Sequence, residues 1–199
     1  MESYLMNLKS FIMFIHLSGL AIGIGGAWIL EAFILKHLKF STISRENFTV
    51  IKFIANFVSI GLAILWFSGL LFLLYYFLYT PELLSNQKVW AKVAIVIILT
   101  INGYFIHRDL LPLIEQCVGS TLQEVLSVGK LAHALFMGVI SFFSWIFPVV
   151  LGVSQSLNFT VSGFSILKVY LFALAGTLII ILLLIKPINS KIQMQPVIA

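Results

Sequence analysis

The sequence predicts an all-α integral membrane protein, built as a bundle of five transmembrane helices. Of its 199 residues, 61% are hydrophobic and 10% are charged, whereas a soluble domain is about half apolar and a quarter charged. Five apolar stretches are each long enough to cross about 30 Å of hydrocarbon as a helix. These stretches lack the alternating pattern of barrel strands, and a helix satisfies its own backbone hydrogen bonds in lipid.

We expect residues 1–199 to form a single transmembrane helical domain. The first and third apolar stretches are the most informative, because ionisable residues lie well inside them. Such residues usually face a protein interior or a polar cavity. The expected spans lie near residues 11–35, 52–79, 89–107, 131–153 and 165–186.

The distribution of lysine and arginine predicts the orientation of the bundle, since cytoplasmic loops are enriched in these residues. With five spans, eight basic residues fall on one side: Lys36, Lys39, Arg45, Lys52, Arg108, Lys130, Lys186 and Lys191. The other side holds four, Lys9, Lys88, Lys92 and Lys168. We therefore expect an external N-terminus and a cytoplasmic C-terminus in a multi-pass protein of the cell inner (plasma) membrane. The formal charge of +5 is scattered, so the expected partner is the lipid bilayer and not nucleic acid.

The first span carries a stripe of small residues. Gly19, Gly23 and Ala27 follow one another at four-residue spacing, a pattern that lets helix backbones approach closely. At about 100° per residue, His16 lies within about 60° of Gly19 and Gly23. The histidine is thus expected on the packing face. The stripe either serves helix packing alone or presses against a cofactor or substrate.

His16 is the first candidate ligand, because histidine binds metals and haem iron and relays protons near neutral pH. Lys92 of the third span enters from the same side at a similar depth. A haem with His16 as its sole protein ligand, and with Lys92 paired to a propionate, is one interpretation. The alternative is a buried histidine that hydrogen-bonds a backbone carbonyl or a serine.

His107 and His133 are a second candidate pair. Both are expected at the cytoplasmic ends of consecutive antiparallel spans, as is His37 at the end of the first span. Two histidines at equal depth in a helical bundle can ligate a b-type haem. The alternative is that this pair, flanked by Arg108 and Lys130, contacts solvent and lipid headgroups.

Two further polar residues lie inside spans. Glu31 is costly in lipid if ionised, and His107 or Arg108 at the exit of the third span are its expected counter-groups, for structural pairing or for a proton relay. Asn102 is expected to hydrogen-bond across helices, which contributes about 0.5–1 kcal/mol in membrane proteins. Pro112 is expected to end the third helix.

Several classes of chemistry are excluded by what the sequence lacks. Cys117 is the single cysteine, so an internal disulfide and a CxxC metal or redox motif are excluded. There is no P-loop, HExxH or GxSxG motif and no set of acidic metal ligands. An ordinary hydrolase is therefore not expected.

A family resemblance covers roughly residues 11–110. The segment HLSGLAIGIGGAW in the first span, the serine and glycine within Phe67 to Leu71, and the lysine-led segment KVAIVIILTINGYFIH resemble small bacterial membrane proteins of the copper-resistance D type. They are also similar to the haem-associated protoporphyrinogen oxidase membrane family, although Lys36 and the two residues after it stand where that family has an arginine-rich end. The resemblance implies a haem- or copper-related membrane role, with His16 as the one position carried over and Lys92 as an optional addition to it.

Three hypotheses of function follow. The leading one is a small membrane protein that binds a redox cofactor or metal, above all b-type haem, through His16 and further through His107 or His133. The second is a small-solute or proton-coupled transport protein in which Glu31, Lys92 and Asn102 line a path. The third is a non-catalytic assembly or scaffold subunit, either self-associating or bound to a membrane partner subunit through the face formed by Gly19, Gly23 and Ala27.

Overall fold

The computed structural model describes the backbone of residues 2–40, 42–121 and 127–192, and these residues are overwhelmingly helical. Five helices are long and apolar enough to span a membrane, at Ser3–Lys36, Arg45–Tyr79, Gln87–Glu115, Gly129–Val153 and Gly163–Leu183. The prediction of an all-helical chain with five such helices is confirmed. The elements in chain order are α1 (Glu2–Phe40), α2 (Arg45–Tyr79), η1 (Pro81–Ser85), α3 (Gln87–Phe105), η2 (Ile106–Leu110), α4 (Leu111–Glu115), α6 (Val128–Val153), η3 (Gln155–Leu157) and α7 (Gly163–Ile192).

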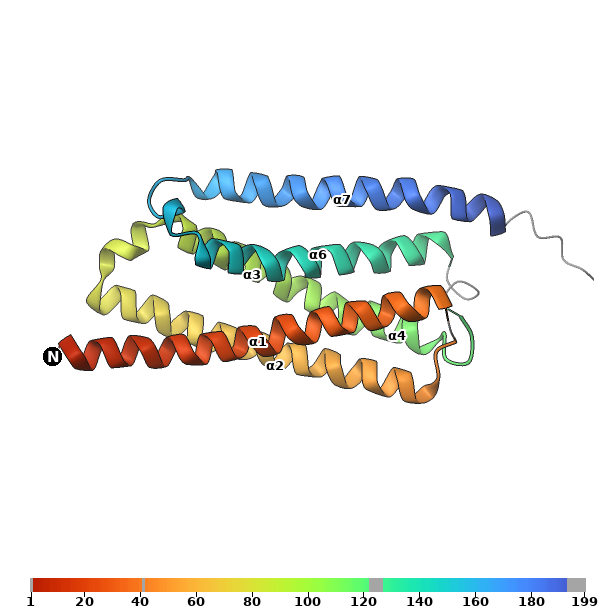
Figure 1. The fold of residues 1–199 in the computed structure, drawn as a ribbon, viewed down its shortest axis with the longest axis horizontal. Helices are drawn as coiled ribbons and strands as arrows, with labels where there is room; N and C mark the ends of the chain where they lie inside the picture. The colour runs from red at the N-terminus through yellow and green to blue at the C-terminus, as the bar shows by residue number, and fades with distance from the viewer. Residues whose placement is uncertain (1, 41, 122–126, 193–199) are drawn as a thin grey trace, which may run out of the picture.

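The helices form two groups that lie side by side (Figure 1). One group is the antiparallel pair α1 and α2, and the other is α3, α6 and α7, in which α6 packs on both α3 and α7. The two groups meet mainly where α1 contacts α6. Since the number of long helices is odd, α1 begins at one end of the bundle and α7 finishes at the other (Figure 1).

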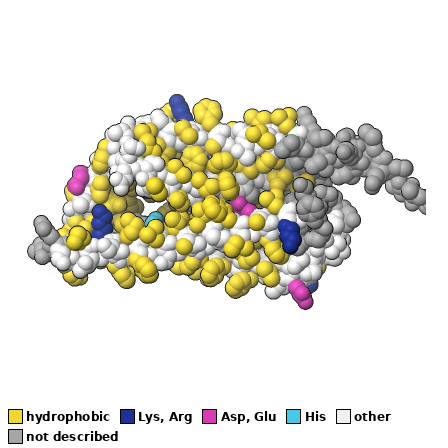
Figure 2. Space-filling view, viewed as in Figure 1, with side chains coloured by type: hydrophobic (Ala, Val, Ile, Leu, Met, Phe, Trp, Pro, Cys, Tyr) yellow, Lys and Arg dark blue, Asp and Glu magenta, His cyan; other side chains and the backbone are white. Residues whose placement is uncertain are grey.

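Hydrophobic side chains cover the face shown in Figure 2. Large apolar residues are exposed on each long helix, among them Phe14, Phe53, Ile97, Val150 and Phe172. In a soluble protein so much exposed apolar surface would be unusual. This surface is compatible with contact with a lipid bilayer.

The pairing of α1 with α2 depends on glycine. A Cβ atom added at Gly61 would lie 2.5 Å from the backbone nitrogen of Gly23, and one added at Gly19 would lie 2.7 Å from a methyl carbon of Ile64. Because a side chain at position 61 would overlap backbone atoms of α1, the two helices can lie this close only if these positions are glycine.

The third helix continues past the proline that was expected to end it. A π-helical turn, η2, follows α3, and Pro112 lies in the first turn of α4. Proline is tolerated in a first turn, where its missing N–H needs no partner within the helix. The helix therefore continues to Glu115, beyond the predicted end near residue 107.

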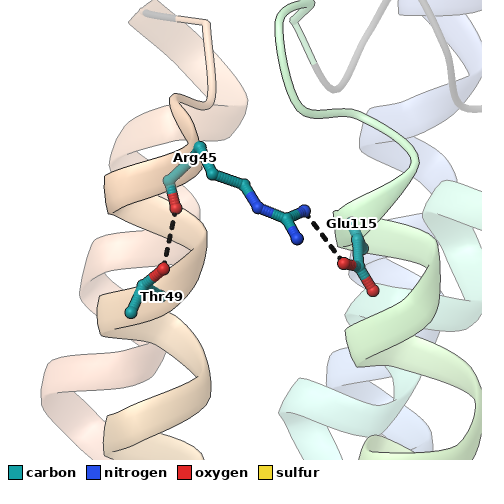
Figure 3. Close-up of polar contacts among 3 residues, drawn as sticks. All are labelled: Arg45, Thr49 and Glu115. Atoms are coloured by element: carbon teal, nitrogen blue, oxygen red, sulfur yellow. Dashed lines mark hydrogen bonds and ion pairs between the residues drawn. The ribbon is translucent and has the colours of Figure 1, made fainter.

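A polar contact ties the start of α2 to the end of α4 (Figure 3). Arg45 Nη1 donates to Glu115 Oε1 at 2.9 Å, and the Thr49 hydroxyl donates to the Arg45 carbonyl. Next to it, Ile43 and Val118 form an isolated parallel bridge. The Arg45–Glu115 pair and this bridge are contacts between the two helix groups at the end of the bundle opposite the N-terminus.

Candidate functional site

His16 is held by a serine of the neighbouring helix. Its Nδ1 atom lies 2.9 Å from the Oγ atom of Ser68, which is fully buried on α2. The hydroxyl of Ser68 donates to the carbonyl oxygen of Ile64 at 2.7 Å. A serine hydroxyl has one hydrogen, so Ser68 must accept from Nδ1–H of His16. This tautomer leaves Nε2 of His16 as a hydrogen-bond acceptor with a free lone pair.

The surroundings of His16 are aromatic on one side and basic on the other. The Phe72 ring meets the imidazole edge-on, with the ring centroids 5.5 Å apart. Lys92 of α3 is near enough to His16 to interact with it electrostatically. No hydrogen bond or ion pair of Lys92 is found among the described residues, whereas Lys88 Nζ donates to the Ser154 carbonyl at 3.0 Å. Lys92 is therefore a free cation beside the histidine.

The surface near this group is hollowed. Figure 2 shows a hollow between the α1–α2 pair and the other three helices, in the half of the bundle that contains the N-terminus, with histidine side-chain atoms at its rim. The sequence placed His16 on the packing face of the first span and at the depth of Lys92. The structure brings these two residues together across the boundary between the two helix groups.

A second polar group lies farther along α1, around a cavity of about 350 Å³. Glu31 of α1, Ser59 of α2, His107 of η2 and Ser141 of α6 contribute polar side chains to its wall. The rest of the wall is mainly aliphatic and aromatic. The carboxyl of Glu31 lies beside Ser141, and its Oε1 atom is buried with no hydrogen-bond partner among the described residues.

Of the two predicted counter-groups of Glu31, one lies near it in the structure and the other does not. His107 lines the same cavity as Glu31, and its Nε2 atom lies 3.0 Å from Oγ of Ser59. Arg108 is not brought to Glu31. Its guanidinium pairs with the neighbouring Asp109 at 2.7 Å, where both side chains are partly exposed.

The candidate haem pair His107 and His133 does not meet around one cavity. The side chain of His133 is exposed and does not line the Glu31 cavity, although it is near enough to Asp109 to interact with it electrostatically. The side chain of His37 lies outside the described residues. Of the histidines whose side chains are described, His16 and His107 are the two that face the interior of the bundle.

Asn102 connects two helices and lies apart from both polar groups. Its Nδ2 atom donates to the Met137 carbonyl of α6 at 3.0 Å, and the side chain is buried. Neither Asn102 nor Lys92 lines the cavity of Glu31. The path that was expected to join these three residues is therefore not seen among the described residues.

The stripe of small residues on α1 packs against other helices of the same chain. Gly19 and Gly23 face α2, and a Cβ atom added at Gly23 would come within van der Waals overlap of the Trp145 ring of α6. Ala27 is buried in a cluster with Leu65 and Trp145. The face proposed for a partner subunit is thus already in contact within the monomer.

The serine partners were not assigned from the sequence, although a signal for Ser68 exists. In an antiparallel helix pair, residues that face each other have numbers with a nearly constant sum. That sum is the same for Gly23 with Gly61, for Gly26 with Val58 and for His16 with Ser68. Aligning the glycines of the first two spans would therefore have paired His16 with Ser68.

The residues available for metal binding are few. No group of three or more His, Cys, Asp or Glu side chains that could hold a metal ion is found among the described residues. Comparisons with protein-family models, curated proteins and solved structures gave no match to the chain.

Proposed function

We propose that the protein binds a redox cofactor, a b-type haem, through His16. The observation that carries the proposal is the orientation of the imidazole, in which Nδ1–H donates to Ser68 and Nε2 is free. Histidines that ligate metals usually donate their other ring N–H to a nearby acceptor, which fixes the tautomer and the ring plane. His16 and Ser68 have this relation.

The residues around His16 fit a haem in charge and polarity. A bound haem would supply one-electron redox chemistry. The chain would hold it in three ways: His16 would coordinate the iron, Ser68 would keep the imidazole in its tautomer, and Lys92 would neutralise a propionate carboxylate.

His107 is the less suitable histidine. The Ser59 hydroxyl donates to the Ala55 carbonyl, so Ser59 accepts from Nε2–H of His107 by the same reasoning that applies to Ser68. The free nitrogen of His107 is then Nδ1, which lies closer to its own backbone. A large planar ligand reaches Nε2 more easily than Nδ1, and this favours His16.

The proposal includes a place and an orientation. The excess of lysine and arginine on the C-terminal side supports an external N-terminus in the inner membrane, with His16 in the outer half of the bilayer. The resemblance of His16–Trp28 to the copper-resistance D type and to the membrane protoporphyrinogen oxidases points to the same kind of cofactor. Since the glycine stripe contacts the chain's own helices, the haem site needs no partner subunit.

The test is a titration of the detergent-purified protein with ferric haem, followed by its Soret absorbance. We expect saturation at one haem per chain and a red-shifted Soret band. His16→Ala should lower the affinity at least tenfold, and His133→Ala, at an exposed histidine, should leave it unchanged. Equal binding by wild type and His16→Ala would contradict the proposal.

A further inference from the structure

The cavity around Glu31 is large enough to hold a small molecule and is not used by the proposed haem site. Its volume of about 350 Å³ lies within the range of ligand sites in proteins. His16 and Glu31 are 15 residues apart on α1, which places them about 22 Å apart along the helix axis at about 1.5 Å per residue. The cavity is therefore a separate site.

One carboxylate oxygen of Glu31 lacks a partner in this cavity, although the carboxyl also contacts Ser141. Its Oε1 atom is buried and unbonded among the described residues, and a buried acceptor left unpaired costs about 1–3 kcal/mol. No lysine or arginine lines the cavity within the described part of the chain. Arg108, the nearest basic residue along the third helix, is paired with Asp109. No basic side chain of the described residues is therefore available in the cavity to pair with the Glu31 carboxylate.

The rest of the wall favours an apolar cation over other ligands. Phe142, Phe143 and Trp145 line the cavity together with many aliphatic side chains. Aromatic faces attract ammonium groups, most strongly where water is excluded. An anion would be repelled by the Glu31 carboxylate and would meet no basic side chain among the lining residues.

We propose that this cavity binds a membrane-permeant apolar amine, whose ammonium group donates to the Glu31 carboxylate while its hydrocarbon body contacts the aromatic and aliphatic wall. The charge of the ligand is complementary to that of the single acidic residue in the lining. In Figure 2, acidic side-chain atoms are visible in a break in the hydrophobic surface, midway along the bundle. Such a break gives an amine dissolved in the bilayer a route to the carboxylate.

The probe is tritiated 1-naphthylmethylamine, and the protein is the full chain in nanodiscs of zwitterionic lipid, assayed by scintillation proximity. We expect saturable binding of one amine per chain, at least tenfold tighter than that of the neutral 1-methylnaphthalene used as competitor. Glu31→Gln should lower the amine affinity at least tenfold. Glu82→Gln, at an exposed position in η1, should leave it unchanged.

A second variant tests the cavity and not the charge. Gly138 lines the cavity, and a Cβ atom added there meets nothing within 4 Å, so Gly138→Leu should fill the space and lower binding at least tenfold. Gly176→Leu is the matched control, because Gly176 is equally open and lies outside the cavity. Each variant is first checked for helical content and thermal unfolding in detergent.

Two results would overturn the proposal. One is wild-type amine affinity in both Glu31→Gln and Gly138→Leu. The other is equal affinity for the amine and for 1-methylnaphthalene, which would make the cavity a site for neutral hydrocarbon such as a lipid chain. His16→Ala should retain amine binding, so the failure of the haem proposal and the failure of this one are separate outcomes.

Discussion

The two polar groups along α1, around His16 and around Glu31, contain similar residues but differ in whether their hydrogen bonds are complete. In both, a serine of α2 donates to its own helix backbone and accepts from a histidine. At His16 this network is complete, and the remaining free groups are a ring nitrogen and the ammonium of Lys92. At Glu31 the network stops short, and a carboxylate oxygen remains buried without a partner.

This difference separates two ways of making a binding site in a membrane. The His16 group has its side chains fixed by hydrogen bonds in advance, and it offers a lone pair to a metal. The Glu31 group has an unpaired acceptor in an apolar cavity, and it offers charge to a donor. The first should lose stability when a partner is removed, and the second should gain stability when the unpaired group is removed.

The largest effect on stability and binding is expected at the close contact between α1 and α2, because the His16 group and the Glu31 group both depend on it. Gly61→Leu would drive a side chain into the backbone of Gly23, and overpacking of this kind costs about 3 kcal/mol at the upper end of its range. We expect a lower thermal unfolding temperature in detergent, together with weaker haem and amine binding. Gly69→Leu, at an open position on the same helix, is the control and should do neither. Normal binding by Gly61→Leu would show that the close helix approach is not required.

Glu31→Met tests the unpaired side of the comparison. The change removes the unpaired Oε1 acceptor and keeps much of the side-chain volume, although it also removes the contact with Ser141. We expect stabilisation of about 1–3 kcal/mol, measured as a raised unfolding temperature. A destabilised Glu31→Met protein would mean that Glu31 is paired in the folded state.

Ser68→Ala tests the complete hydrogen-bond network at His16. The substitution removes the acceptor of His16 Nδ1–H, so we expect a loss of about 1 kcal/mol and a reduced haem affinity. Second-shell changes at metal sites typically cost 10–100-fold in affinity. Ser59→Ala is the matched variant, since it removes the equivalent partner of His107, and it should lower stability without changing haem affinity. The reverse ranking of the two variants would assign the haem to His107.

The smallest effect is expected at the polar contact between α2 and α4. The side chains of Arg45 and Glu115 are 70% and 47% exposed, and exposed ion pairs contribute about 0.2–1 kcal/mol. Arg45→Met should therefore lower the free energy of unfolding by less than about 1 kcal/mol and leave both sites intact. A larger loss would indicate that this contact controls how the two helix groups are held.

Composition and the length of the apolar runs were sufficient to predict five helices, because lipid leaves the backbone no other solution for such segments. The helix ends were predicted less well. Apolar runs mark where a helix can lie in hydrocarbon, but helical hydrogen bonding continues beyond that, so α1 begins at Glu2 and not near residue 11. Pro112 was misleading because a π-helical turn moves it into the first turn of a new helix segment.

Features of the candidate site could be predicted from the sequence only where they depend on the geometry of a single helix. Helical geometry alone placed His16 on the glycine face. Predicting the pairing with Ser68 required the register between the first two helices, and the boundaries of the spans do not give that register. For Arg108, the adjacent Asp109 provides a partly exposed partner, and this local pairing takes the place of a longer reach to Glu31.

The most direct test of the account is the reduced-minus-oxidised absorption spectrum of the protein purified in detergent after expression in cells that make haem. We predict a b-type difference spectrum for the wild type and for Glu31→Met, and its loss in His16→Ala. This result would show that His16 holds the haem and that the haem does not depend on Glu31. A wild-type spectrum in His16→Ala, or wild-type protein that shows no Soret band even after haem is added, would contradict the central claim.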